Sequence, residues 1–195
     1  MNHNNSFIIF DLETNGLVNS SVLSISAIKV VFLSEINCLG VIDTYNRYYF
    51  RNRNESINMK AIKINGLSDE KIKSLRENQQ YPEHFIKDID AFKAFCNEAL
   101  LFIAHNISFD KSFVPFIQNS NNLFCTMKSN ININKKGKWP TLENTAKYYH
   151  VSLQKNNLHN SQYDVALCFE IVKAMYRREN IELLKTLLKH GITNA

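Results

Sequence analysis

The chain has 195 residues, 45% of them hydrophobic, so it can bury one core and is expected to form a single domain over residues 1–195. Its net charge of +5 favours a polyanionic partner, and its four cysteines form no CxxC or CxxxC pair, which argues against a zinc site or a disulfide framework. No run approaches the ~20 apolar residues of a membrane span, so we expect a cytoplasmic protein with no membrane partner.

The first half of the chain is predicted to form strands and then short helices. β-Branched and aromatic residues with partial alternation, which are typical of strands, occupy residues 6–12, 22–33 and 39–50. Short polar connections between these segments predict an antiparallel meander. Helical patterns follow over residues 58–63, 68–76 and 88–99.

The second half is predicted to contain one strand and several helices. Residues 100–104 form a short apolar run typical of a buried strand, and 106–118 is a helix candidate that Pro115 should bend or end. Further helices are expected over 142–150 and over 164–189, the latter long and amphipathic. Strands first, with one strand–helix unit in the middle, predict an α/β fold in which helices surround a mixed β-sheet.

Two carboxylates end the first strand, in the stretch FIIFDLETNG that begins at Phe7. Asp11 and Glu13 are two positions apart, so on a strand they share one face at a spacing of roughly 6–7 Å. Phe10 and Leu12 then point the other way, into a core. Like charges at the end of a buried strand require a positive partner, either basic side chains or a cation.

Two later segments carry further acids. In AHNISFD, Asp110 falls in the first turns of a helix after a buried strand, where an acid also simply favours the helix dipole. In HNSQYD, His159 and Asp164 could not share a face of one helix. We therefore expect His159 in the loop before a helix, Asn160 or Ser161 near the cap, and Asp164 about one turn inside.

Together these segments offer four carboxylates and one histidine in a basic chain. Oxygen ligands of this kind suit Mg²⁺ or Mn²⁺ rather than zinc or copper. Two such ions about 3.5–4 Å apart are an established means of cleaving a phosphodiester. A histidine with a reference pKa of about 6.5 can take the proton from the attacking water.

FDLETNG, AHNISFD and HNSQYD, in this order, resemble the three motifs of the DnaQ-like (DEDDh) 3′→5′ exonucleases, a family that includes the ε subunit of DNA polymerase III and ribonuclease T. The resemblance covers residues from about 6 to 178 and leaves 179–195 as a C-terminal helix or tail. It implies a ribonuclease H-like mixed β-sheet flanked by helices. Weaker similarities lie at residues 63–67, 125–128 and 142–146.

The resemblance also implies roles for individual residues. Asp11, Glu13 and Asp164 would bind one divalent cation, and Asp110 would help Asp11 to hold a second. His159 would be the general base. The implied substrate-binding residues, which would hold the terminal nucleotide, are Thr14, Asn15, Gly16, Leu17, His105, Asn106 and Phe109. The chain departs from the family at Asn65, where family members often have histidine. It departs again at Asn160-Ser161, where family members usually have two small residues.

Two aromatic features outside the motifs have less specific interpretations. Lys135-Lys-Gly-Lys-Trp139 could contact phosphates and stack on a base, but we expect Trp139 to pack against the following helix. The phenylalanines between residues 92 and 116 are expected to form core, with Phe109 on the floor of a cleft beside Asp110.

The leading hypothesis is a metal-dependent exonuclease that releases nucleoside 5′-monophosphates from single-stranded 3′ ends, with DNA favoured over RNA. It could act alone or as the proofreading partner of a DNA polymerase, and a homodimer is compatible with the resemblance. The alternative is a non-catalytic nucleic-acid-binding or adaptor protein on the same fold. Unpaired carboxylates argue against that alternative, because they weaken the binding of a polyanion unless metal offsets them.

Overall fold

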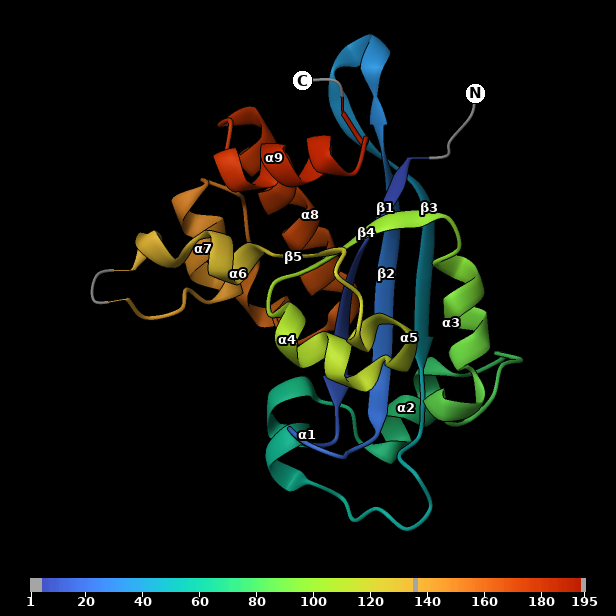
Figure 1. Cartoon of the computed structure of the whole chain (residues 1–195). Helices are drawn as coiled ribbons and strands as arrows, with labels where there is room; N and C mark the ends of the chain where they lie inside the picture. Colours follow the sequence, from blue (N-terminus) through green and yellow to red (C-terminus); the bar gives the residue numbers. More distant parts are fainter. Residues whose placement is uncertain (1–4, 135–136, 194–195) are drawn as a thin grey trace.

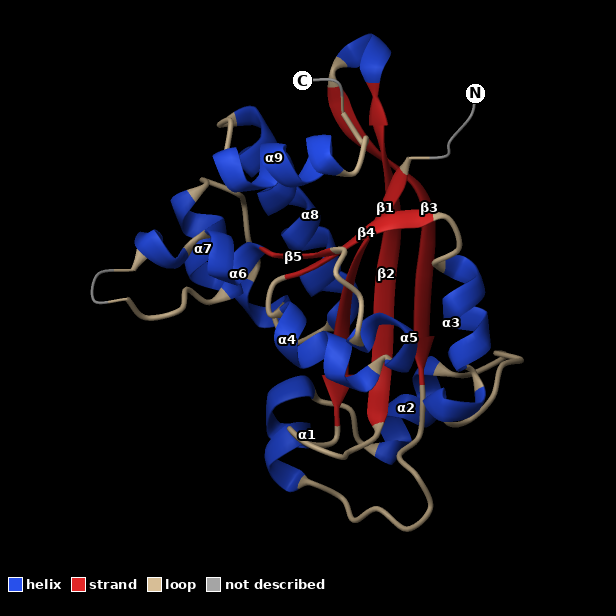
Figure 2. Ribbon diagram, viewed as in Figure 1, coloured by secondary structure: helices blue, strands red, loops and turns tan. Residues whose placement is uncertain are grey.

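The computed structural model describes residues 5–134 and 137–193. Within these residues a single sheet contains five strands in the order β3-β2-β1-β4-β5 (Figures 1 and 2). The strands are β1 (Ser6–Thr14), β2 (Val22–Leu33), β3 (Cys38–Tyr48), β4 (Ala99–Ala104) and β5 (Leu123–Cys125). β1 pairs antiparallel with β2, and β2 antiparallel with β3, while β4 runs parallel to both β1 and β5. The mixed sheet and the meander are therefore confirmed.

The helices surround this sheet, as Figure 2 shows. They are α1 (Met59–Asn65), α2 (Asp69–Leu75), α3 (Ile89–Phe95), α4 (Ile107–Asp110), α5 (Pro115–Gln118), α6 (Thr126–Ser129), α7 (Leu142–Tyr148), α8 (Ser161–Arg177) and α9 (Ile181–Lys189). No helix in the described ranges is both long enough and apolar enough to cross a membrane.

Two predicted helices are each divided in the structure. The helix expected over 106–118 is α4, a 3-10 turn over Lys111–Phe113, and α5, which begins at Pro115 because proline is tolerated only in the first turn. The helix expected over 164–189 is also wrong as one element. α8 ends at Arg177, Glu179 takes a left-handed φ of 54°, and the side chain of Asn180 caps α9 by accepting from the Leu183 N–H.

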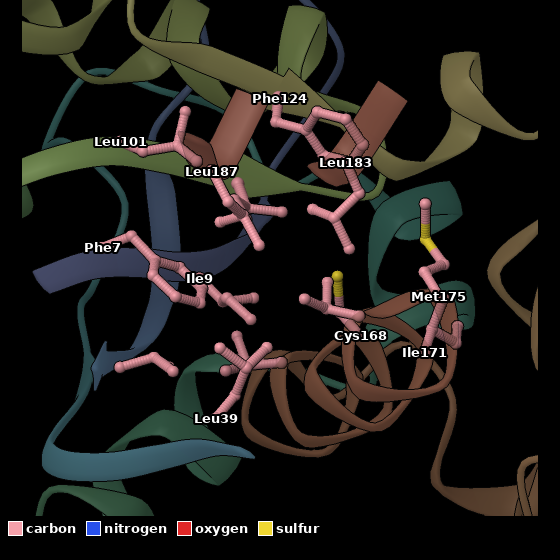
Figure 3. Close-up of a cluster of buried hydrophobic side chains, with 14 of the residues drawn as sticks. Phe7, Ile9, Leu39, Leu101, Phe124, Cys168, Ile171, Met175, Leu183 and Leu187 are labelled. Carbon is pink, nitrogen blue, oxygen red and sulfur yellow. The ribbon is translucent and has the colours of Figure 1, made fainter. Parts of the chain in front are cut away.

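Alternation along β1 divides the core between the two faces of the sheet. Phe7 and Ile9 pack toward α8 and α9, with Leu39, Leu101, Phe124, Cys168, Ile171, Met175, Leu183 and Leu187 (Figure 3). Ile8, Phe10 and Leu12 pack on the other side, toward α3, α4 and α5. Asp11 and Glu13 continue the α8-facing row, while Phe10 and Leu12 point into the opposite core, as predicted.

Candidate active site

The end of β1 presents its two acids to the first turn of α8. Between Glu13 and Thr14 the pairing with β2 shifts by one residue, a bulge of the kind that re-aims side chains at sheet ends. Ser161, the first residue of α8, fixes the helix to β2 through hydroxyl contacts of 2.9 Å with Ser24 and 2.8 Å with Ser26. The start of α8 is thereby held against the strand beside β1.

His159 and Asp164 lie as the sequence predicted. Asn160 is the N-cap of α8 and accepts from the Tyr163 N–H, so Asp164 falls in the first turn and His159 in the preceding loop. His159 is exposed and has a left-handed φ of 66°, and its backbone N–H donates to Asp164 Oδ2 at 3.0 Å. Ligand atoms of Glu13, His159 and Asp164 lie within 4.8 Å of one another.

Asp110 reaches the same place from β4. Parallel strands bring their carboxyl ends to one edge, so α4, which follows β4, begins beside the end of β1. The Asp110 carboxylate is buried and accepts a hydrogen bond from the Leu12 backbone N–H. The structure therefore brings all four predicted carboxylates together from segments that are far apart in the sequence.

The proximity of these acids changes their protonation. Burial, and then the charges of Asp110, Glu13 and Asp164, hold the pKa of Asp11 well above its usual value. Burial, and then the charges of Asp164 and Asp110, raise the pKa of Glu13 to about 8. Burial raises the pKa of Asp110 to about 7 and that of Asp164 to about 6, although backbone hydrogen bonds lower both. Among the residues that the structure describes, no salt bridge involves any of these four acids.

The donor set fits divalent cations with a preference for oxygen. Asp164 Oδ1 is buried and, among the described residues, has no hydrogen-bond partner, although a buried carboxylate oxygen normally has one. A cation satisfies such an oxygen and removes the repulsion between the acids. The carboxylates of Asp11, Glu13, Asp110 and Asp164 are groups that could hold a divalent cation here.

A cavity of about 690 Å³ opens over the acids, within the usual range for small-molecule sites. Its lining includes the four carboxylates and most of the predicted substrate-binding residues: Thr14, Gly16, Leu17, His105, Asn106 and Phe109. Phe109 is therefore at the cleft, as expected. Helix α1 also lines the cavity, with Lys60, Ala61, Ile64 and Asn65, and none of these was among the predicted site residues. The available signal was the weak similarity to the family at residues 63–67, which overlaps the end of this helix.

Asn15 is the one predicted substrate-binding residue that the cavity lining does not include. Its side chain is buried outside the cavity lining, donating to Glu55 Oε1 at 2.6 Å and to the Ser56 carbonyl at 2.9 Å, and accepting from the Asn58 N–H at 3.1 Å. Its backbone N–H donates to the Ser21 carbonyl at 2.9 Å. The Asn15 side chain thus bonds within the protein, and nucleotide binding by the backbone of this loop, which the resemblance implies, stays a prediction.

The expected packing of Trp139 is also corrected. The side chain is 51% exposed and lines the cavity beside Pro140 and Thr141. Lys135 and Lys136 of the same basic stretch lie outside the described residues. His105 lines the cavity as predicted, but protein groups contact both of its ring nitrogens.

A model of the RNase T exonuclease family matches residues 8–172, and the chain belongs to this family, with the sheet and helices of a DnaQ-like, ribonuclease H-like exonuclease. It is 25% identical over 189 residues to a PolC-type DNA polymerase III from Staphylococcus aureus strain bovine RF122 / ET3-1, across 92% of this chain. The chain spans 12% of the length of that relative.

Solved structures share the fold. E. coli exonuclease I in complex with a dA16 oligonucleotide superposes with a TM-score of 0.70 at 16% identity, covering 95% of this chain and 43% of that one. Cell-death related nuclease 4 (CRN-4) superposes with a TM-score of 0.64 at 12% identity, covering 91% and 66% of the two chains. At these identities the likeness concerns architecture.

Proposed function

We propose that this exonuclease acts in the 3′→5′ direction on single-stranded nucleic acid, DNA in preference to RNA, and releases nucleoside 5′-monophosphates. Asp11, Glu13, Asp110 and Asp164 hold two Mg²⁺ or Mn²⁺ ions, and His159 is the general base. The observation that carries the proposal is the convergence of four carboxylates with raised pKa values around a buried carboxylate oxygen with no protein partner in the described residues. Structural roles alone do not explain such a cluster.

The protein groups have distinct tasks in this reaction. When bound, the cations supply the positive charge that promotes ionisation of the attacking water and offsets charge on the phosphate and the leaving 3′ oxygen. His159 takes the proton from that water, and its exposed position leaves the ring free to pass the proton to solvent. The bond from its backbone N–H to Asp164 holds the loop so that the ring stays near the carboxylates. Leu17 and Phe109, on the cavity wall, contact the terminal nucleotide.

The test uses 5′-labelled single-stranded DNA and RNA oligonucleotides, with Mg²⁺, Mn²⁺ or EDTA, and the Asp11→Asn variant. We expect a ladder that shortens from the 3′ end with metal and disappears with EDTA or in the variant. Full activity in Asp11→Asn contradicts the metal assignment. Binding that survives EDTA, with no ladder on either substrate, supports the non-catalytic adaptor instead.

The similarity to a PolC-type DNA polymerase III supports a second candidate, an editing exonuclease that works with a polymerase. An editing enzyme meets 3′ ends on duplex DNA and must favour those that are unpaired. We expect faster removal of the terminal nucleotide from a primer–template with a 3′ mismatch than from the matched duplex. Equal rates on these two duplexes, both far below the rate on single strands, favour the independent enzyme.

A further inference from the structure

Trp139 lines the cavity and lies in the loop between the 3-10 turn Ile131–Ile133 and α7. With 51% of its surface exposed it is one of three large apolar side chains that line the cavity and remain mostly in water; the other two are Leu17, 80% exposed, and Ile64, 59% exposed. The four acids lie in the same cavity. A large apolar surface left in water beside a polar reaction centre marks a site that a ligand covers.

The loop that carries Trp139 is held by a half-buried histidine, His105. One ring nitrogen of His105, Nε2, lies 3.0 Å from the Pro140 carbonyl oxygen, and the other, Nδ1, lies 3.0 Å from Thr126 Oγ1. A carbonyl can only accept, so Nε2 carries the proton and donates to Pro140. Nδ1 therefore accepts from the Thr126 hydroxyl. Burial lowers the pKa of His105 to about 4, which keeps the ring in this neutral form at physiological pH.

The backbone on both sides of this contact is also fixed. The His105 carbonyl accepts from the Met127 N–H at 3.0 Å and from Cys125 Sγ at 3.3 Å, which ties the end of β4 to β5 and α6. On the far side, Thr141 caps α7 by accepting from the Asn144 N–H at 3.1 Å. Trp139 therefore projects from a short segment anchored at Pro140 and Thr141. An aromatic ring held in this way loses little conformational entropy when a flat ligand covers it.

We propose that Trp139 is a stacking platform for a nucleobase of the strand bound in the cavity, and that His105 is the positioning residue that holds this platform beside the acids. The assignment rests on the proposed function and deepens it, because it names the part of the substrate that this wall contacts. Both hydrogen-bonding positions of the His105 ring are occupied by the protein, so His105 acts through Pro140 and not on the strand directly. Stacking on a π-face is tolerant of base identity, so this wall adds affinity without sequence preference.

The sole tryptophan of the chain makes the proposal measurable without turnover. In Asp11→Asn with Mg²⁺, we expect oligothymidylate to quench the fluorescence of Trp139, whereas an oligonucleotide of equal length with abasic 3′-terminal nucleotides does not. Anisotropy of a labelled oligonucleotide measures binding independently. Binding with equal fluorescence for the two strands overturns the stacking and leaves the exonuclease intact. The absence of any binding overturns both.

Steady-state kinetics of variants made in the active enzyme tests the roles of Trp139 and His105 separately. Trp139→Ala should raise KM about 5- to 150-fold, the range for losing one base–aromatic stack, with a much smaller change in kcat, and Trp139→Phe should recover most of the loss. Tyr148→Ala is the matched control, because Tyr148 is an aromatic residue on α7, 52% exposed and absent from the cavity lining, and should leave KM unchanged.

His105→Ala should shift the emission of Trp139 in the free protein and raise KM, because the loop loses its anchor. Added to Trp139→Ala, it should raise KM no further, since the two changes remove the same contact with the strand. Additive losses in the double variant, or an unshifted emission in folded His105→Ala, overturn the positioning role. Circular dichroism establishes that each variant is folded.

Discussion

The four acids of the site destabilise the folded chain whenever they are ionised without a cation. Each has a folded-state pKa above its value in the unfolded chain, so the unfolded state loses its protons first as the pH rises. The free energy of unfolding therefore falls as the pH rises above about 4, the unfolded value. The loss is complete only above the folded value, which for Glu13 is about 8. Below pH 4 the cluster has no such cost.

Because ionised acids destabilise the fold, removing one of them by Asp11→Asn should stabilise the protein at high pH. In EDTA at pH 8.5 the variant should melt about 3–8 °C above the wild type, because one of the repelling charges is gone, and the gain should shrink strongly at pH 5. Saturating Mg²⁺ should raise the Tm of the wild type at pH 8.5 more than that of the variant. Calorimetry at the two pH values measures both effects. Glu35→Gln, at an exposed acid in the turn Ser34–Ile36, is the control. A gain of equal size at both pH values contradicts the account.

The position of His159 fits either a general base or a metal ligand, and a substitution distinguishes the two roles. Its ring nitrogen is close enough to Glu13 and Asp164 to share a cation with them, yet the residue is exposed and belongs to a loop. If His159 is the general base, His159→Gln should lower kcat by about 10²- to 10⁴-fold. The affinity for Mn²⁺ should stay nearly unchanged, because the carboxylates remain. Isothermal titration calorimetry measures that affinity. A large loss of Mn²⁺ binding would assign the histidine to the metal instead.

At the scale of elements, α1 is fastened to the end of β1 by a polar latch. Asn15 donates to Glu55 and Ser56 and accepts from the Asn58 N–H, and Asn58 in turn caps α1 by accepting from the N–H groups of Lys60 and Ala61. Glu55 also accepts from the Ser21 N–H at 2.9 Å. The latch therefore joins the end of the strand that carries Asp11 and Glu13 to a helix that lines the cavity.

Loss of the latch should weaken both the fold and substrate binding. Asn15→Ala removes three hydrogen bonds from a buried position and should lower the free energy of unfolding by about 1–3 kcal/mol. KM should rise, because α1 becomes mobile, and amide hydrogen exchange should be fastest over Met59–Asn65. Asn52→Ala, at an exposed asparagine of the loop that carries Glu55, should change neither the free energy of unfolding nor KM. Unaltered exchange in α1 would show that other contacts hold the helix.

Local patterns predicted those elements whose own residues determine them. Residues 22–33 were assigned as a strand because alternation and β-branching are strong there, and Pro115 marked the helix break. β5 was missed because three residues carry too little pattern and depend on pairing with β4. The side-chain contacts of Asn15 were not predicted because its partner Glu55 is 40 positions away, and no local rule links the two. The exposure of Trp139 was not predicted, because it depends on which distant segments surround the cavity, and the local sequence does not show them.

At the scale of the whole molecule, topology assembles the site. The parallel pairing of β1 and β4 places the strand end with Asp11 beside the helix with Asp110, and the serine contacts bring α8 with Asp164 against the same sheet. The sequence shows the residue types and their order, and only the resemblance to the family predicted that the four acids lie together. Spacing alone could not have brought them together, because it holds no information on which strands are neighbours.

The basic charge of the molecule has a local counterpart at the cavity. Lys60 lines the cavity, Lys63 lies on the same helix in an adjoining groove, and Lys138 precedes Trp139; all three are exposed. If each neutralises one phosphate of a single strand, the slope of log K against log salt should be about −2. The affinity should then fall about 15- to 20-fold between 50 and 200 mM salt.

Replacing these lysines tests whether the charge acts locally. Lys60→Ala should reduce the magnitude of the salt slope by about 0.7 and weaken binding of all sequences alike, since a phosphate contact carries no base information. Lys185→Ala is the matched control, because α9 lies at the opposite end of the sheet from α1 (Figure 1). It should leave the slope unchanged if the strand follows the cavity. Equal effects of the two substitutions, measured by anisotropy over a salt series, would mean that net charge alone attracts the strand and that these three lysines have no special part in binding it.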